Sequence, residues 1–156
     1  MLTIAKISGA VATAVIACCI GTVAPASATS NLQLFGAQET LKDMNGPLTG
    51  YTVTGLMPSS DPVPYPVAGR LYEATVTANA LDGTVTPAVP NFNARALGGD
   101  NYPALADVSS LSAAPVGPGE SSTGKVYFDV VGATPNSVVF NNGFEDILGW
   151  VGPPAG

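Results

Sequence analysis

Apolar and polar residues alternate along three stretches of this sequence, at residues 49–56, 71–80 and 125–131. A period of two residues is typical of a β-strand that packs one face against a core and leaves the other face in water. The residues expected on the packed faces are Tyr51, Val53, Tyr72, Ala74, Val76, Ala78, Val126, Phe128 and Val130. The pattern therefore predicts strands in a layered β structure.

Turn-forming sequences separate these stretches, namely Asn45-Gly46-Pro47, Asp82-Gly83, Gly98-Gly99-Asp100 and Asn141-Asn142-Gly143. Such residues tolerate positive φ angles, and Asp82-Gly83 is the strongest candidate for a tight β-hairpin. The proline-rich residues 58–66 and 115–119 are expected to be loops, because proline lacks the amide hydrogen of a central strand. No stretch keeps a helical period for three turns without meeting Gly or Pro. An antiparallel sandwich or barrel is the predicted fold.

The first 28 residues have the features of an export signal. Lys6 supplies a positive charge, residues 7–23 form an almost uncharged apolar run, and Ala26-Ser27-Ala28 has the small-x-small pattern of a signal peptidase site. We expect cleavage between Ala28 and Thr29. Residues 1–28 are then a removed signal peptide, and residues 29–156 form a single exported domain without a membrane span.

Two other interpretations of this segment remain. Residues 7–23 could stay in the membrane as an anchor, although the run is short and contains Ser8, Gly9 and Thr13. Alternatively, Val15-Ile16-Ala17-Cys18 resembles a lipobox, in which case Cys18 would carry a lipid and hold the protein at the cell surface. The alanines at 26 and 28 favour simple cleavage and secretion.

Composition narrows the chemistry of the predicted mature chain. Both cysteines, Cys18 and Cys19, lie in the signal, so the remaining 128 of 156 residues have no disulfide and must fold on their core alone. The chain contains no His, and without Lys6 it has four basic residues against 11 acidic ones, a formal charge of −7. The electrostatic field of this net negative charge repels nucleic acid and anionic membrane surfaces.

Four segments resemble a known family of exported proteins. They are YPVAGRLYEATV at residues 65–76, GTVTPAV with FNAR at residues 83–95, STGKVYFDV at residues 122–130 and NNGFEDIL at residues 141–148. In order and spacing they are similar to the immunoprotective extracellular proteins, small secreted immunogens of mycobacteria and related actinobacteria. Residues 31–44 and 104–114 show little likeness to the family.

The resemblance implies an immunoglobulin-like β-sandwich, an exported product and no catalytic motif. Residues 118–130 also resemble immunoglobulin-like domains of bacterial lipoproteins, which supports the alternative of a lipid on Cys18. The family supplies no catalytic motif to carry over, and we predict no catalytic residue, no cofactor and no bound metal.

The residue types present leave little room for catalysis. Without His or Cys, the mature chain has no Ser-His-Asp triad, thiolate nucleophile or His-ligated zinc. Hydrolysis by two carboxylates needs only Asp or Glu beside a cleft. In the closest acidic pair, Glu145-Asp146, the two side chains would not share a site, because neighbours on a strand point to opposite faces. We expect this pair at the start of a turn or at a solvated edge.

A few further side chains are candidates for binding or stability. Trp150 and the outward-facing Tyr127 are possible partner contacts, although a lone Trp more often closes a core. Arg70 and Arg95 are candidates for ion pairs with Glu73 or Asp129. The loop acids Asp100, Asp107 and Glu120 match no known calcium-loop spacing and are expected to be solvated.

Three hypotheses of function follow from the sequence. The first is a secreted, monomeric, non-catalytic binding module for an unidentified extracellular protein, lipid or glycan. The second is an extracellular hydrolase that works through carboxylates. The third is an envelope component tethered by a lipid on Cys18. Export and the missing catalytic residues favour the first hypothesis.

Overall fold

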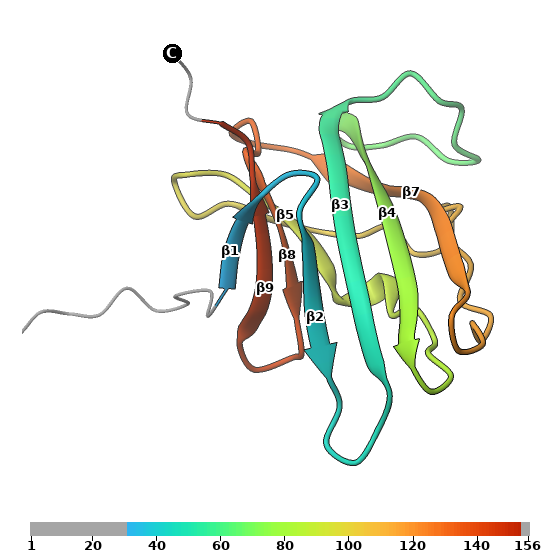
Figure 1. The fold of residues 1–156 in the computed structure, drawn as a ribbon. Coiled ribbons are helices and arrows are strands. Elements are labelled where there is room, and N and C mark those ends of the chain that lie inside the picture. Colours follow the sequence, from blue (N-terminus) through green and yellow to red (C-terminus); the bar gives the residue numbers. More distant parts are fainter. Residues whose placement is uncertain (1–30, 154–156) are drawn as a thin grey trace, which may run out of the picture.

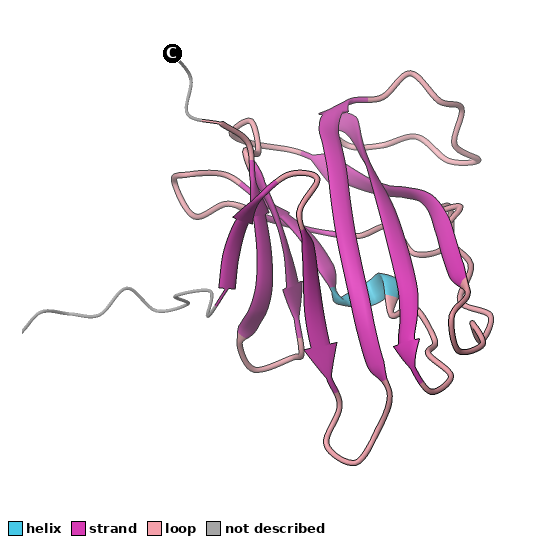
Figure 2. Cartoon of the chain, in the orientation of Figure 1, coloured by secondary structure: helices cyan, strands magenta, loops and turns pink. Residues whose placement is uncertain are grey.

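Residues 31–153 are described by a computed structural model and form two stacked β-sheets (Figure 1). Strands dominate this part of the chain, with a single turn of 3₁₀ helix between two of them (Figure 2). The elements are β1 (Asn31–Leu34), β2 (Gln38–Lys42), β3 (Leu48–Pro58), β4 (Arg70–Asp82), η1 (Val89–Asn91), β5 (Phe92–Arg95), β6 (Asn101–Pro103), β7 (Ser121–Val130), β8 (Ser137–Asn141) and β9 (Asp146–Val151).

The four-stranded sheet has the antiparallel order β2-β3-β4-β7 and contains all three alternating stretches. Each residue predicted for its packed face is buried: Tyr51, Val53, Tyr72, Ala74, Val76, Ala78, Val126, Phe128 and Val130. The outer face carries threonine on neighbouring strands, where Thr77 and Thr123 share a hydrogen bond of 2.9 Å. The alternation read from the sequence is therefore confirmed.

The five-stranded sheet has the order β1-β9-β8-β5-β6. Strands β9, β8, β5 and β6 are antiparallel neighbours, whereas β1 pairs with β9 in parallel. After Leu34, a turn at Gly36 (φ +95°) leads the chain into β2 of the other sheet. The predicted immunoglobulin-like antiparallel sandwich is confirmed, with β1–β9 as its parallel pair among the described strands.

Aromatic side chains from the five-stranded sheet fill the space between the sheets. Phe92, Phe140 and Trp150 are each at most 4% exposed and belong to one cluster with the packed face of the other sheet. Trp150 also donates its indole hydrogen to the Ala37 carbonyl at 2.9 Å. Burial of these large rings, rather than a disulfide, holds the two sheets together.

The predicted hairpin at Asp82-Gly83 is wrong. Gly83 does turn with a φ of +72°, but the chain then leaves the sheet, and Val85 pairs with Val116 in a separate bridge. No edge is open beside β4, because β3 flanks it on one side and β7 on the other. A turn sequence favours a hairpin only where the preceding strand has a free edge.

The proline-rich segments are loops, as expected, and the second of them belongs to a longer covering segment. Residues 105–111 of this segment lie against the outer edge of β7, where the Ser110 amide donates to the Lys125 carbonyl at 2.8 Å. This close approach requires Gly124, because a β-carbon there would lie 2.3 Å from the backbone nitrogen of Leu111. The covered edge cannot pair with another chain.

Candidate functional site

A pocket of about 380 Å³ opens at one end of the sandwich, which we call the end pocket. Three segments meet there: the β2–β3 turn, the β8–β9 turn and the chain between β4 and η1. Figure 1 shows both turns at the same end of the molecule. The lining residues are Leu41, Lys42, Asp43, Met44, Pro47, Thr49, Tyr51, Val85, Thr86, Ala88, Asn91, Phe140, Asn142 and Ile147.

Three aromatic rings pack closely at the inner end of this pocket. The rings of Tyr51 and Phe140, one from each sheet, stack with centroids 5.3 Å apart and an interplanar angle of 28°. Phe92 meets both rings edge-on at 5.4 and 5.2 Å. Both Tyr51 and Phe140 are almost fully buried, so the pocket ends at their edges rather than at an open ring face.

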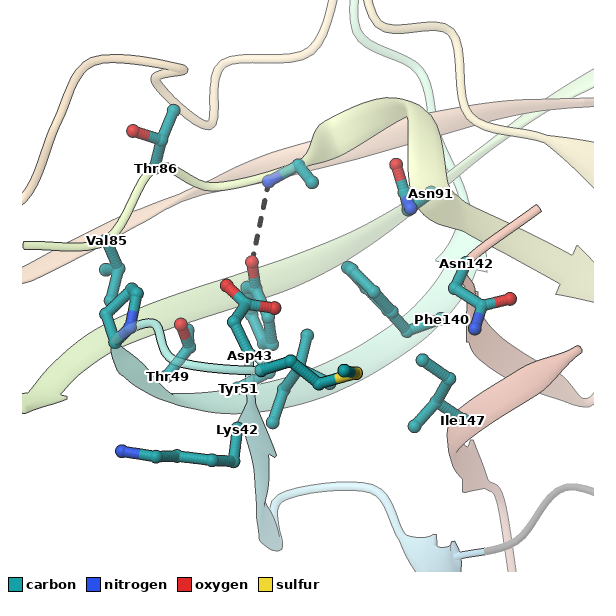
Figure 3. A pocket seen from close by; sticks show the side chains of 14 residues that line it. Lys42, Asp43, Thr49, Tyr51, Val85, Thr86, Asn91, Phe140, Asn142 and Ile147 are labelled. Atoms are coloured by element: carbon teal, nitrogen blue, oxygen red, sulfur yellow. Dashed lines mark hydrogen bonds between the residues drawn. The ribbon is translucent and has the colours of Figure 1, made fainter. Parts of the chain in front are cut away.

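The Tyr51 hydroxyl lies at the inner end of the pocket and is only half used (Figure 3). It accepts a long hydrogen bond of 3.4 Å from the Ala88 amide, and no residue in 31–153 accepts its hydrogen. Burial raises the pKa of Tyr51, the Ala88 amide opposes this rise, and the negative charge of Asp43 adds to it. The hydroxyl therefore keeps its proton and can donate it to a ligand.

Two charged side chains lie on the β2–β3 side of the pocket. The Asp43 carboxylate has no hydrogen-bond or ion-pair partner among the described residues, and Figure 3 shows it beside Tyr51. The Lys42 ammonium lies 3.6 Å from the carboxylate of Asp82, and both side chains are mostly exposed. The unpaired charge at this site is thus negative.

Asparagines extend the site along the outer rim. Asn91 and Asn142 line both the end pocket and an adjoining depression of about 310 Å³, which also contacts Asn93 and Asn141. The Asn91 amide group donates to the Asn141 carbonyl at 2.8 Å, and the Asn142 side-chain oxygen accepts from the Phe144 amide at 2.9 Å. The Asn91 side-chain oxygen and the Asn142 amide hydrogens have no partner within residues 31–153.

A second polar group, here called the Lys125 cluster, lies on the outer face of the four-stranded sheet and comprises Ser59, Asp61, Glu73, Lys125 and Tyr127. The Lys125 ammonium lies 2.7 Å from Asp61 and 3.1 Å from Glu73. The Tyr127 hydroxyl donates to Asp61 at 2.6 Å, and the Ser59 hydroxyl donates to Glu73. These contacts fasten the loop after β3 to the sheet.

The charges of this cluster stabilise one another. Hydrogen bonds to Asp61 and Glu73 raise the pKa of Lys125, and the bonds from Lys125 and Tyr127 lower the pKa of Asp61. Burial and the bond to Asp61 raise the pKa of Tyr127 to about 12. Because Lys125 stays protonated, it cannot remove a proton from Ser59 or Tyr127 near neutral pH. The arrangement is that of a structural clamp.

The acidic pair at the start of β9 differs from the sequence expectation. Glu145 is exposed, but the Asp146 side chain is fully buried and binds Arg95 in a two-pronged contact, with one nitrogen–oxygen distance of 2.7 Å. The Asn141 amide group adds a third bond at 2.7 Å. The prediction of a solvated Asp146 is wrong, because Arg95 reaches it across β8 and compensates its charge.

The expected arginine pairings are also wrong. Glu73 binds Lys125, and Asp129 accepts hydrogen bonds of 2.8 Å from the backbone amides of Ala68 and Gly69. Arg70 forms none of the ion pairs found among residues 31–153. The partners are therefore decided by strand register and loop position, which the sequence does not display.

Both aromatic candidates for partner contact are covered. Trp150 is 0% exposed, so its interpretation as a core residue is confirmed. Tyr127 does point outward from β7, but it is only 7% exposed, so the expectation of an exposed ring is wrong. The loop containing Asp61 covers it, an effect that strand alternation alone cannot reveal. The predicted cleavage residues Ala26, Ala28 and Thr29, and Cys18, lie outside the described residues.

Two of the three loop acids accept hydrogen bonds from backbone amides. Asp100 accepts from the Ala133 amide at 3.0 Å, Glu120 accepts from the Gly117 amide at 3.1 Å, and Asp107 is exposed. Within residues 31–153 no three acidic, histidine or cysteine side chains gather closely enough to hold a metal ion. The same part of the chain has no helix long and apolar enough to cross a membrane.

Sequence reasoning missed the end pocket. It identified Asn45-Gly46-Pro47 and Asn141-Asn142-Gly143 as turns, and both are turns. It could not place them together, because they lie in different sheets and almost 100 residues apart. Asp43 and Asn142 beside those turns are the residues that such a placement would have singled out.

Comparisons with known proteins identify the family. Residues 30–150 match the family described as a domain of unknown function, DUF1942. The chain belongs to the DUF1942 family. The immunogenic proteins MPB63 of Mycobacterium bovis and MPT63 of Mycobacterium tuberculosis are each 48% identical to it over 120 residues, which cover 74% of this chain and 76% of each relative.

A solved structure agrees with this assignment. A crystal structure of MPT63, described as a secreted protein from Mycobacterium tuberculosis, matches 80% of this DUF1942 chain and 99% of its own with a TM-score of 0.75 and 45% identity. The likeness to secreted mycobacterial immunogens that the sequence segments indicated is confirmed.

Proposed function

We propose that this DUF1942 protein is exported, loses residues 1–28, and acts outside the cell as a monomeric, non-catalytic binding module. The signal-like N-terminus supports export, and so do relatives that are named immunogenic proteins and, in one crystal structure, a secreted protein. The same relatives support the proposal that this chain is an immunogen.

The observation that carries the binding role is the end pocket. It is a hollow at one end of the two packed sheets, and it combines apolar walls with hydrogen-bonding groups that no described residue uses. Ligand sites are concave, largely preformed and supplied with a few polar groups that fix orientation. The Lys125 cluster, in contrast, has its charges matched internally.

Amide NMR spectra of residues 29–156 test this role with a panel of defined lipids, oligosaccharides and peptides. The exposed Thr86 lines the pocket, and Thr86→Trp would fill it; Thr84→Trp places the same bulk at an exposed position outside the pocket. We expect shifts around Asn91 and Asn142 that Thr86→Trp abolishes and Thr84→Trp preserves. Equal binding by both variants would contradict the proposal.

A second candidate is an envelope protein held by a lipid on Cys18, favoured by the lipobox-like Val15-Ile16-Ala17-Cys18. The intact mass of the native protein, measured in culture medium and in the membrane fraction, separates the two. A mass that begins at Thr29 in the medium supports secretion. A lipid-modified mass that begins at Cys18 in the membrane, lost on Cys18→Ala, supports the tether.

A further inference from the structure

The polar groups left open in the end pocket define the kind of ligand that fits it. They include one hydroxyl donor at Tyr51, amide hydrogens at Asn142, an amide oxygen at Asn91 and a carboxylate at Asp43, none of which has a further partner within the described chain. A ligand that satisfies this set must offer several donors and acceptors close together.

Charge argues against an anionic ligand. The Asp43 carboxylate is unpaired, whereas the neighbouring Lys42 ammonium lies 3.6 Å from Asp82. A phosphate, sulfate or carboxylate in the pocket would meet a like charge and no free cation.

The shape argues against a simple organic cation. A quaternary or primary ammonium ion binds best over the face of an aromatic ring. Here Tyr51 and Phe140 are 2% and 4% exposed, so that their faces are closed by packing. A small cation would also leave the amides of Asn91 and Asn142 unused.

The apolar walls of the end pocket set a further condition on the ligand. Leu41, Met44 and Ile147 line the pocket, and Ile147 lies on the side opposite the segment that carries Thr86 and Asn91 (Figure 3). Met44 stands at the mouth and is 95% exposed. The ligand therefore needs an apolar face as well as hydroxyl-like groups along its edge, which is the chemistry of a sugar ring.

The adjoining depression indicates that the ligand is longer than a single sugar ring. It shares Asn91 and Asn142 with the pocket, and Asn93 and Asn141 continue the row of amides. The bonds of 2.8 Å from Asn91 to Asn141 and of 2.9 Å from the Phe144 amide to Asn142 fix these side chains before any ligand arrives. Such preorganisation lowers the entropy cost of binding.

We infer that the end pocket and the adjoining depression bind a neutral oligosaccharide, with Asp43 and Asn142 hydrogen-bonded to ring hydroxyls. This inference rests on the proposed binding function and names its ligand class. Asp43 accepts hydrogen bonds from two neighbouring hydroxyls, and Asn142 donates to a third.

The test is calorimetric titration of residues 29–156 with neutral, amino and acidic oligosaccharides and with alkylammonium ions. We expect the neutral oligosaccharides to bind with little dependence on salt concentration. Asp43→Ala should weaken binding about tenfold, as expected for the loss of a hydrogen bond to a charged group. Asp107→Ala, which removes an exposed carboxylate outside the pocket, should leave it unchanged.

Three results would overturn the inference: no neutral oligosaccharide binds, only ions bind, or Asp43→Ala and Thr86→Trp bind the sugar as well as the native chain. These are distinguishable from failure of the proposed function. If a lipid or peptide binds and Thr86→Trp blocks it, the pocket is a binding site but its ligand is not a sugar. If nothing binds there, both proposals fail.

Discussion

The Lys125 cluster and the end pocket are built from the same kinds of side chain, but their hydrogen-bonding groups are used differently. In the cluster, Lys125 lies between Asp61 and Glu73, and Tyr127 and Ser59 donate to those same two carboxylates. In the pocket, the Tyr51 hydrogen and the Asp43 carboxylate have no partner among the described residues.

This difference indicates that the Lys125 cluster contributes to stability, whereas the end pocket is available for recognition of a ligand. Polar groups that satisfy one another hold loops and sheets together, because removing one member leaves another desolvated without a partner. Groups that remain open at a concave surface contribute little to folding and remain available to a ligand. The comparison therefore predicts that changes in the matched groups reduce stability, whereas changes in the pocket leave it intact.

The largest loss of stability is expected where the matched charges are most deeply buried. Asp146→Ala leaves the Arg95 guanidinium without the carboxylate that it contacts in the native fold. We expect a loss of about 3–5 kcal/mol in the free energy of unfolding, measured by urea denaturation. Glu145→Ala, at the exposed neighbouring position, is the control; an equal effect of both changes would break the comparison.

Within the Lys125 cluster, Tyr127→Phe should cost about 1 kcal/mol, because it removes the 2.6 Å hydrogen bond to the half-exposed Asp61. The pKa of Tyr127 is about 12 in the folded chain and 10.0 in the unfolded chain. The contribution of the protonated Tyr127 hydroxyl to stability is therefore complete below pH 10.0 and is lost as the pH rises to about 12. Burial also raises the pKa values of Tyr51 and Tyr102, so ultraviolet titration should show a late phenolate signal that loses the contribution of one tyrosine in Tyr127→Phe and is unchanged in Tyr65→Phe. A Tyr127 that titrates near its ordinary pKa would contradict the clamp.

Glu39 is an intermediate case between the cluster and the pocket, because its carboxylate is buried but only one of its two oxygens accepts a hydrogen bond in the described chain. One carboxylate oxygen accepts from the Gly149 amide at 3.2 Å, and the other has no partner in the described chain. Burial raises the pKa of Glu39 above its ordinary value, and the Gly149 bond opposes this rise. A raised folded pKa means that ionisation destabilises the fold as the pH increases.

Glu39→Gln is therefore expected to stabilise the protein by about 1 kcal/mol at about pH 7, and to have little effect at about pH 3, where the carboxyl is almost fully protonated in both states. Urea denaturation at the two pH values checks this result. Glu145→Gln serves as the exposed control. A loss of stability at the higher pH would show that Glu39 is matched in the folded protein.

The smallest change in stability is expected in the pocket. Asp43→Asn alters an exposed side chain without a partner among residues 31–153, so the free energy of unfolding should change by less than about 0.5 kcal/mol. Thermal and urea denaturation measure this change. A larger loss would show that Asp43 supports the fold and would weaken its assignment to ligand binding.

The sandwich was predictable because its strongest signals are local. A period of two along residues 49–56, 71–80 and 125–131 depends only on each strand having one buried face, and each stretch is a strand with that face buried. Turn residues such as Asn45-Gly46 were equally readable, because Asn45 does adopt a φ of +61°.

Features that join distant parts of the chain were not predictable in this way. The burial of Tyr127 depends on a loop more than 60 residues away, and the buried Asp146 depends on Arg95 across an intervening strand. The Asp82-Gly83 turn kept its local geometry but not its predicted hairpin, because the neighbouring edge of β4 was occupied. The end pocket is the extreme case, since three separate segments form it.

The parallel pairing of β1 with β9 ties the beginning of the folded domain to its end. Asn31 lies opposite Leu148, and the indole of Trp150 reaches back to the Ala37 carbonyl. A chain that leaves the cell with its N-terminus first keeps β1 without a neighbour until almost every other residue has followed. The β1–β9 pair therefore forms only when nearly the whole domain is present, and its formation carries the entropy cost of closing a loop of more than 100 residues.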